Sequence, residues 1–500
     1  MKRMIKRIGA FVLGAVILGT SSMAVCAADS NYTYNYDWWG DVQGSPDFYT
    51  VANVYTSADL GLDVNLSAPQ GLFVSGSLMY LCDTGNNRII ELERVSRNEI
   101  EVRRIIDEFK GDVEVKTFSS PTDVAVSAEG EFYIADRGNS RILKLDKDLN
   151  YLMQFDKPVD STLDPEAGFQ PSKIAIDTAG RVYCVAIGIN KGLIKYENNG
   201  EFSGFVGATK VRFNWTDYIW KKLATQAQRD RMESFVPTEY DNLYMDDEGF
   251  IFVVEGDQQE EQLKENTDSA VRRLNLLGND ILVRNGEWYT YGDLYMGSGG
   301  GYEGPSSFKD VTALDNDVYI CMDEKRGRLF GYDQQGRLLF ACGGNGNMDG
   351  YFKKPAALDH MGSDLIVVDS LDCSLTLFIP TEFGSLVYQA MEQFDVGEYD
   401  ASEASWREAM KLNGNYDLAY IGIGRALLSQ ERYEEALDYF ELKYDADNYS
   451  KAYRQYRKEW VEDHIGIIIA VILALFLIPM SIGKVKAIKH EIDIADIFRR

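Results

Sequence analysis

The stretch DTGNNRIIEL occupies residues 83–92, and two similar stretches follow it, DRGNSRILKL at 136–145 and DEKRGRLFGY at 323–332. Each of them places an arginine five positions after an acidic residue and then continues as an apolar segment. A phrase that returns along one chain is typical of a structural repeat. This repeated phrase therefore decides which kind of fold the sequence forms.

The same prelude precedes each acidic residue: usually a proline, then an apolar segment, a turn and a second apolar segment. Clear copies are APQGLFVSGSLMYLCD, SPTDVAVSAEGEFYIAD and KPAALDHMGSDLIVVD, which end at Asp83, Asp136 and Asp369. Weaker copies end at Ala186, Glu255 and Asp323, which gives six units in all. Two further strand-like segments usually follow, so each unit is predicted to be a four-stranded antiparallel meander.

Sheets of this kind bury their faces by packing radially around a centre, as in a β-propeller. The copies resemble NHL repeats, and the resemblance covers roughly residues 45–384. It implies a mainly β protein with a six-bladed NHL-type β-propeller. We expect this domain to be followed by a small helical segment and one transmembrane helix.

Two interpretations of the repeated acids are open. In the structural one, the carboxylate that ends strand two and the arginine that opens strand three join their turn by charge-assisted hydrogen bonds. The residues concerned are Asp83, Arg88, Asp136, Arg141, Asp323, Arg328 and Asp369. In the functional one, implied by resemblance to lactonases of the same architecture, inward-pointing carboxylates form a central metal ring.

The sixth unit lacks a fourth strand of its own, which predicts how the ring is closed. Five units have a candidate fourth strand, including DILVRNG at 280–286, whereas the sixth unit runs from SLTLFIP directly into a helical pattern. The segment FYTVANVYT at 48–56 alternates like a strand and precedes the first unit. We therefore expect residues 48–56 to complete the last blade.

Residues 385–463 change to a helical period. A 34-residue spacing relates Ala390 to Gly424, Tyr399 to Tyr433 and Trp406 to Phe440. Around the second copy, GIGRALLSQERYEEALDYF closely resembles a tetratricopeptide repeat, whereas the first copy has Ser402 where the second has Ala436. A final helix at 448–463 is predicted to complete this segment, which is interpreted as a stalk or as a peptide-binding groove.

Two apolar segments predict targeting to a membrane. Residues 1–28 combine early lysines and arginines, an apolar run and a small-residue stretch, as in a secretory signal peptide. Residues 465–482 contain no charged side chain and are long enough to span a bilayer as a helix. Lysines follow in the tail at 483–500, so the positive-inside rule places the C-terminus in the cytoplasm and the preceding domains outside.

Composition excludes several function classes. A net charge of -27 makes nucleic acid a poor partner. His360 and His464 are the only histidines between the signal and the tail, so a multi-histidine metal or acid/base site is excluded. The cysteines have no zinc-site spacing and mostly lie in apolar runs, which predicts small buried hydrophobic residues and not disulfides. No metal is predicted, although carboxylates and amides alone would permit calcium.

The long connections predict the binding face. In a four-stranded blade, the turns between strands two and three and those leading to the next blade lie on one face. All the long connections are of these two kinds: 156–171, 208–236, 255–270, 285–307 and 341–354. They include a predicted helical insert at 208–236, and they supply the candidate ligand or partner contacts Trp215, Tyr218, Trp220, Tyr295, Tyr302, Glu260 and Glu261. Aromatic surfaces with acidic acceptors suit a neutral sugar or a basic peptide.

Two functions are compatible with these features. The first is a single-pass cell-membrane protein whose extracytoplasmic propeller recognises a ligand or protein partner, with no catalytic residues. Similar bacterial proteins that join such repeats to a membrane helix are associated with solute importers, which implies an accessory role in sugar uptake. The alternative is a calcium-dependent hydrolase of the gluconolactonase type.

Overall fold

The computed structural model describes residues 33–498 except 162, 164, 165, 167, 209–238, 257, 259, 261, 262, 264–268, 287 and 296–301, with side chains described up to residue 493. The chain divides into two compact units, Met1–Ser385 and Leu386–Arg500. The first unit contains the propeller, and the second contains helices. The predicted signal at 1–28 and the predicted helical insert at 208–236 lie outside the described residues, apart from residue 208.

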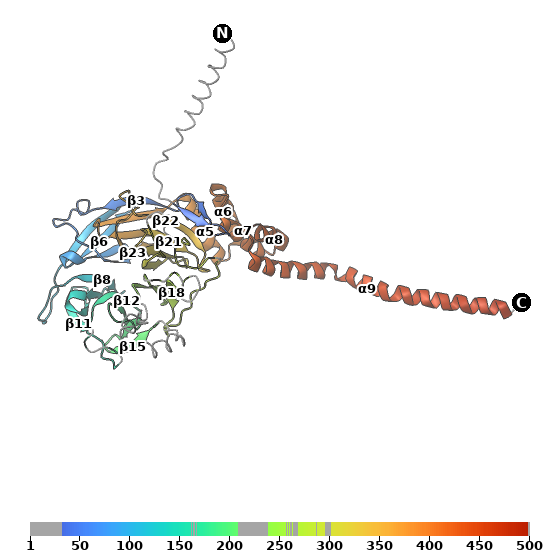
Figure 1. Ribbon diagram of the computed structural model, residues 1–500, viewed down its shortest axis with the longest axis horizontal. Coiled ribbons are helices and arrows are strands. Elements are labelled where there is room, and N and C mark those ends of the chain that lie inside the picture. Colours follow the sequence, from blue (N-terminus) through green and yellow to red (C-terminus); the bar gives the residue numbers. More distant parts are fainter. Residues whose placement is uncertain are drawn as a thin grey trace, which may run out of the picture. The chain divides into compact units, whose positions relative to one another are not determined.

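The first unit is a six-bladed β-propeller, as the repeats predict (Figure 1). Blade one consists of β4 (Gly71–Ser75), β5 (Leu78–Asp83), β6 (Arg88–Ser96) and β7 (Glu99–Ile106). Blade two consists of β8 (Pro121–Val126), β9 (Phe132–Asp136), β10 (Arg141–Leu145) and β11 (Tyr151–Phe155), with the short helix η2 (Arg137–Asn139) between β9 and β10. Blade three consists of β12 (Pro171–Ile176), β13 (Val182–Ala186), β14 (Leu193–Tyr196) and β15 (Phe202–Val206).

The other three blades depart from this plan. Blade four has β16 (Asn242–Met245), β17 (Ile251–Val254) and β18 (Val271–Leu274). Blade five has β19 (Phe308–Ala313), β20 (Tyr319–Asp323), β21 (Arg328–Tyr332) and β22 (Leu338–Gly343). Blade six has β23 (Pro355–Met361), β24 (Asp364–Asp369) and β25 (Ser374–Pro380). The predicted fourth strand at 280–286 is wrong, because this segment makes only an isolated bridge between Leu274 and Asp280.

An N-terminal strand completes blade six. β3 (Tyr49–Tyr55) pairs antiparallel with β25, with Tyr55 opposite Leu375 and Tyr49 opposite Pro380. The two ends of the propeller sequence therefore share one sheet. This pairing covers the edge of β25, which would otherwise expose unpaired backbone groups.

A hairpin that the sequence analysis did not predict extends blade five. β1 (Tyr34–Tyr36) pairs with β22, and β2 (Val42–Gly44) pairs with β1, so this sheet has six strands. The three-residue strands are too short to carry a period-two pattern that identifies a strand. Their position therefore depends on contacts with residues far along the chain.

The core lies between neighbouring blades, where apolar faces pack against each other. One cluster joins Leu81 and Ile90 of blade one with Ile366 and Leu377 of blade six. Other clusters join blades one and two, two and three, three and four, and four and five. Neighbouring blades therefore bury apolar surface against each other, as expected for repeats that stack into a ring.

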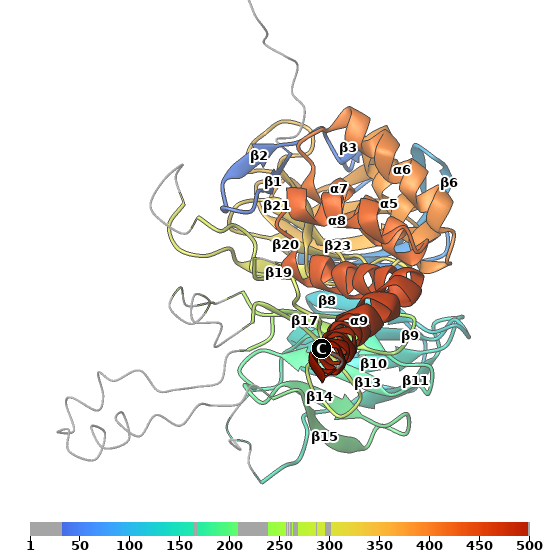
Figure 2. The same ribbon diagram turned by 90° about the vertical axis from the view of Figure 1, so that its right-hand side faces the viewer.

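The second unit is built from helices that pack in sequence. They are α5 (Glu382–Asp395), which begins in the first unit, α6 (Tyr399–Leu412), α7 (Asp417–Ser429), α8 (Tyr433–Leu442) and α9 (Ala446–Phe498). Figure 2 shows α6, α7 and α8 side by side. Phe440 packs so closely on Gly424 that a Cβ there would lie 2.6 Å from its ring, which is why a glycine occupies this position.

α9 joins two segments that the sequence analysis treated separately. The helix predicted at 448–463 and the apolar segment at 465–482 form one helix of 53 residues, about 80 Å long, and Pro479 lies inside it. Of the helices described, α9 has the length and apolar composition needed to cross a membrane. The apolar side chains of its membrane-length segment at 465–482 are largely exposed, so this segment is not the core helix of either unit.

Candidate functional site

The repeated acids act as structural clamps in blades one and two. Arg88 Nε donates to Asp83 Oδ2 at 2.7 Å, and Arg141 Nε donates to Asp136 Oδ2 at 2.9 Å. The second oxygen of each carboxylate accepts a backbone N–H of the connection that enters the blade. The donor is Ser67 in blade one and Ser119 in blade two, each at 2.7 Å. Both carboxylates are fully buried, so they join two turns and do not point into the central channel.

Blade five uses a different acid. Arg328 lies opposite Asp323 in the sheet, yet its guanidinium pairs with Asp293 in the preceding connection. Asp323 instead lies 3.6 Å from Arg326 and accepts the backbone N–H of Ser307. The predicted pairing of Asp323 with Arg328 is therefore wrong, because an acid distant in sequence competes for the arginine.

Blade six has no arginine at the corresponding position. Asp369 lies opposite Ser374 and accepts backbone N–H groups from Lys353 at 2.6 Å and Lys354 at 3.0 Å. Backbone amides thus replace the arginine as donors to this buried carboxylate. The role of Asp369 is the same as that of the other clamps.

β-Bulges shape the mouth of the central channel. The innermost strands β8, β12, β19 and β23 each have a bulge directly after their first paired residue. The extra residues are Thr122, Ser172, Lys309 and Ala356, and all four line one cavity. Bulges redirect side chains and often occur next to functional sites. Four of the six blades therefore present a bulge residue to the same space, and its side chain differs from blade to blade.

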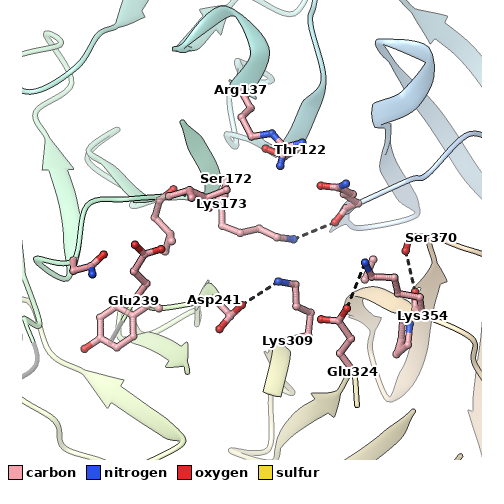
Figure 3. A pocket seen from close by; sticks show the side chains of 17 residues that line it. Thr122, Arg137, Ser172, Lys173, Glu239, Asp241, Lys309, Glu324, Lys354 and Ser370 are labelled. Carbon is pink, nitrogen blue, oxygen red and sulfur yellow. Dashed lines mark hydrogen bonds and ion pairs between the residues drawn. The ribbon is translucent and has the colours of Figure 1, made fainter. Parts of the chain in front are cut away.

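The cavity has a volume of about 570 Å³ and lies where the innermost strands begin. The turns from strand two to strand three and the connections between blades meet at this end of the propeller, so the cavity lies on the predicted long-loop face. Seven of the residues that line it are charged: Arg137, Lys173, Lys309 and Lys354 are basic, and Glu239, Asp241 and Glu324 are acidic. Figure 3 shows Lys309 beside Asp241, with 3.0 Å between them, and Lys354 beside Glu324, with 3.7 Å.

Lys173 forms the floor of the cavity with buried acids. Its Nζ donates to Gln70 O at 3.3 Å and lies 3.9 Å from Asp123 Oδ1. Burial opposes the charge on Lys173, but the carboxylates of Asp123 and Asp310 outweigh it and raise the lysine pKa. Burial raises the pKa of Asp123 to about 6 and that of Asp310 to about 7, against the opposing effect of Lys173. The ammonium of Lys173 thus stabilises the charged forms of both buried carboxyl groups.

The same acids link neighbouring blades. Asp123 of β8 accepts the N–H of Ile174 in β12 at 2.8 Å, and Asp310 of β19 accepts the N–H of Leu358 in β23 at 2.7 Å. Asp359 of β23 accepts the N–H of Val74 in β4 at 2.7 Å. A carboxylate on one innermost strand therefore holds the next strand at three places around the channel.

These contacts also test whether the channel fits a metal ion. No group of three His, Cys, Asp or Glu side chains in the described part of the chain is arranged to hold one. His360 Nδ1 lies 2.8 Å from Thr312 Oγ1, which satisfies it within the channel wall. Asp123 faces the ammonium of Lys173, so this carboxylate already has a cationic partner within the chain.

The predicted ligand contacts are only partly described. Trp215, Tyr218, Trp220 and Glu261 lie outside the described residues. Tyr295 is exposed, and Tyr302 lies under the guanidinium of Arg326, with 5.8 Å to its ring centroid. Glu260 is half-buried. None of these three residues lines the cavity.

None of the residues that line the cavity was predicted from the sequence as a ligand contact. A signal was present, because the residue directly after the leading proline is polar in four units, and three of these residues, Gln70, Thr122 and Ser172, line the cavity. The bulge that turns Thr122 and Ser172 toward the channel is not visible in the sequence pattern. Five cysteines are free in the described part of the chain, and four of them are buried, as predicted.

Comparison with known proteins agrees with the fold. Residues 118–145, which run from the approach to β8 to the end of β10, match the NHL repeat. This NHL segment contains the Asp136 and Arg141 clamp and the bulge residue Thr122. Among curated proteins, none matches this chain.

Solved propellers resemble the chain only distantly. A streptogramin B lyase is 12% identical over 66% of this chain and 98% of its own, with a TM-score of 0.39. Virginiamycin B lyase from Staphylococcus aureus is 9% identical over 66% and 99%, with a TM-score of 0.38. The RRP9 WD40 repeats are 11% identical over 67% and 100%, with a TM-score of 0.40. Likenesses at this level carry no information about ligand or reaction.

Proposed function

We propose that this protein is a membrane-anchored extracytoplasmic recognition protein whose NHL-type propeller binds a ligand or protein partner on its long-loop face. The observation that carries the proposal is the charged cavity at the mouth of the channel, which opens on that face. A rigid ring of blades can hold such a site in place while the connections vary. An accessory role in the uptake of a sugar or similar solute fits this arrangement.

The helical unit supports an interaction role. Ser402 Oγ donates to Ala390 O at 2.7 Å, which joins α6 to α5 at the position where the second copy of the repeat has an alanine. Beyond this contact, α6 packs on α7, α7 on α8 and α8 on α9, in the order of the chain. We infer tetratricopeptide-like repeats that serve as a spacer or as a second docking surface.

α9 supplies the proposed anchor. Its apolar segment at 465–482 would span the bilayer, and the lysines after it would hold the C-terminal end in the cytoplasm. The 19 residues of α9 before the apolar segment would extend about 28 Å outside the membrane as a helix. The propeller and the other helices would then lie outside the cell.

Crosslinking from the two faces of the propeller tests the proposal. A photoreactive residue is placed at Tyr295, which is 66% exposed in a connection of the long-loop face, in the full chain in its native membrane. The matched control carries the same residue at Asp148, in the short turn between β10 and β11 on the opposite face. We expect a partner to be captured from position 295 and not from position 148. Capture from position 148 alone would show that the binding surface is on the opposite face, which would contradict the proposal.

A further inference from the structure

Two polar groups at the cavity have no partner in the described part of the chain. The guanidinium of Arg137 makes no hydrogen bond or ion pair there, although the backbone of this residue is held in η2. Asn190 Oδ1 is buried in the cavity wall without a hydrogen-bond donor. Buried polar groups in native proteins are almost always paired, so an unpaired acceptor requires a donor from elsewhere.

Among the described residues, Arg137 is the basic residue of the cavity with which no acidic side chain pairs. Lys309 is paired with Asp241, Lys354 with Glu324, and Lys173 with the acids of the channel floor. Figure 3 shows Arg137 entering the cavity from the side opposite to Lys309. Arg137 therefore has its charge and its forked donor groups available for a ligand.

The acids of the wall retain capacity to accept hydrogen bonds. Glu239 Oε1 accepts the N–H of Gly188 at 3.0 Å, and its second oxygen has no donor among the described residues. Glu239 and Asn190 both line the cavity, and both offer acceptor oxygens. Acceptors of this kind suit hydroxyl groups on a ligand.

We propose that the cavity binds a small hydroxylated carboxylate, such as a sugar acid, with Arg137 as the group that binds its carboxylate. The guanidinium fork matches a carboxylate in a bidentate geometry. Hydroxyl groups of the same molecule donate to Asn190 and Glu239. The volume of about 570 Å³ is within the range of small-ligand sites. This proposal rests on the proposed function, in which the long-loop face is the binding face.

Calorimetric titration of the full chain in detergent micelles tests this ligand class. The probes are D-glucuronate, D-glucose and acetate, which separate the carboxylate from the hydroxyl groups. We expect D-glucuronate to bind at least about tenfold more tightly than either of the others, as befits one charged hydrogen-bonding contact in addition to neutral ones. Equal affinities for D-glucuronate and D-glucose, or for D-glucuronate and acetate, would overturn the proposal.

Variants assign the carboxylate contact to Arg137. Arg137→Gln is expected to weaken D-glucuronate binding at least about tenfold and to leave D-glucose binding unchanged. Arg137→Lys keeps the charge without the fork and is expected to give an intermediate affinity. Arg97→Gln, an exposed arginine in the turn between β6 and β7 on the opposite face, is the matched control and should behave like the parent.

Two further readouts keep the proposal separate from folding and from partner capture. The thermal midpoint of Arg137→Gln is expected to equal that of the parent, because Arg137 supports no other described residue. Unchanged D-glucuronate affinity in Arg137→Gln would overturn the ligand assignment. Crosslinking from position 295 that persists in this variant would at the same time leave the proposed function of the face intact.

Discussion

Arg328 pairs with Asp293, in the connection that enters blade five, although Asp323 lies directly opposite Arg328 in the sheet. Asp293 also accepts the hydroxyl of Tyr36 at 2.9 Å and lies 3.1 Å from Arg326 Nε. Burial and the charge of Asp293 raise the pKa of Tyr36, so its hydroxyl stays protonated and can donate. One carboxylate thus joins the N-terminal hairpin, a long connection and β21.

Replacement of Asp293 is expected to destabilise this corner of the propeller. Asp293→Asn leaves the partly buried Arg328 without its counter-ion and leaves the largely buried Arg326 with Asp323 alone, at 3.6 Å. Removal of one partner from a buried pair typically costs about 3 kcal/mol or more. Hydrogen exchange should show the amides of β1 and β2 losing protection first. Asp372→Asn, which removes an exposed partner of Lys353, is the control and should cost less than about 1 kcal/mol. Equal effects of the two changes would contradict the role assigned to Asp293.

Deletion of residues 45–57 is expected to open the ring. This deletion removes β3 and leaves β25 as an unpaired edge beside the apolar cluster shared by blades one and six. An exposed edge of this kind promotes aggregation. Light scattering and thermal unfolding of the full-length and deleted chains measure the effect. A deleted chain that unfolds cooperatively at the parent temperature would show that β3 is dispensable.

The buried acids of the channel floor predict a pH dependence of stability. Asp123 and Asp310 have folded-state pKa values of about 6 and 7, above their ordinary value near 4 in the unfolded chain. Between these values the folded chain binds more protons than the unfolded chain, so these two groups make stability fall as pH rises from about 4 to about 7. The slope approaches about 1.4 kcal/mol per pH unit for each group.

The variants Asp123→Asn and Asp310→Asn should reduce this slope, because the asparagine amide does not titrate. Unfolding by denaturant at several pH values between about 4 and 7 measures the difference. Asp148→Asn, at an exposed turn of the same propeller, is the control and should leave the slope as in the parent. Parallel curves for all three variants and the parent would refute the contribution of these acids.

Truncation before residue 465 is expected to release the protein from the membrane. The apolar part of α9 carries exposed Ile, Leu and Phe side chains, whose removal from lipid is unfavourable by tens of calories per mole for each Å². Cell fractionation should find the full chain with membranes and the truncated chain in the soluble fraction. A truncated chain that still sediments with membranes after carbonate extraction would show that another segment is the anchor.

The sequence by itself determined the repeat, the number of blades and the change to helices after residue 384. These features depend on the order of apolar and polar residues over short stretches of the chain. Short apolar runs that end at an acidic residue identify β5, β9 and β24, and the clamps Asp83 with Arg88 and Asp136 with Arg141 join residues only five positions apart. A charge-free run identifies the apolar part of α9 in the same way. Such signals depend on neighbours along the chain and need no knowledge of the folded partners.

The tertiary structure decided what depends on residues that are distant in sequence. Arg328 finds Asp293 in place of Asp323, and β1 pairs with β22 across some three hundred residues. The bulges at Thr122 and Ser172 lie where β8 pairs with β9 and where β12 pairs with β13, and both residues line the cavity together with Arg137. Local periodicity carries no information about which side chains converge there, because the convergence is produced by closure of the ring.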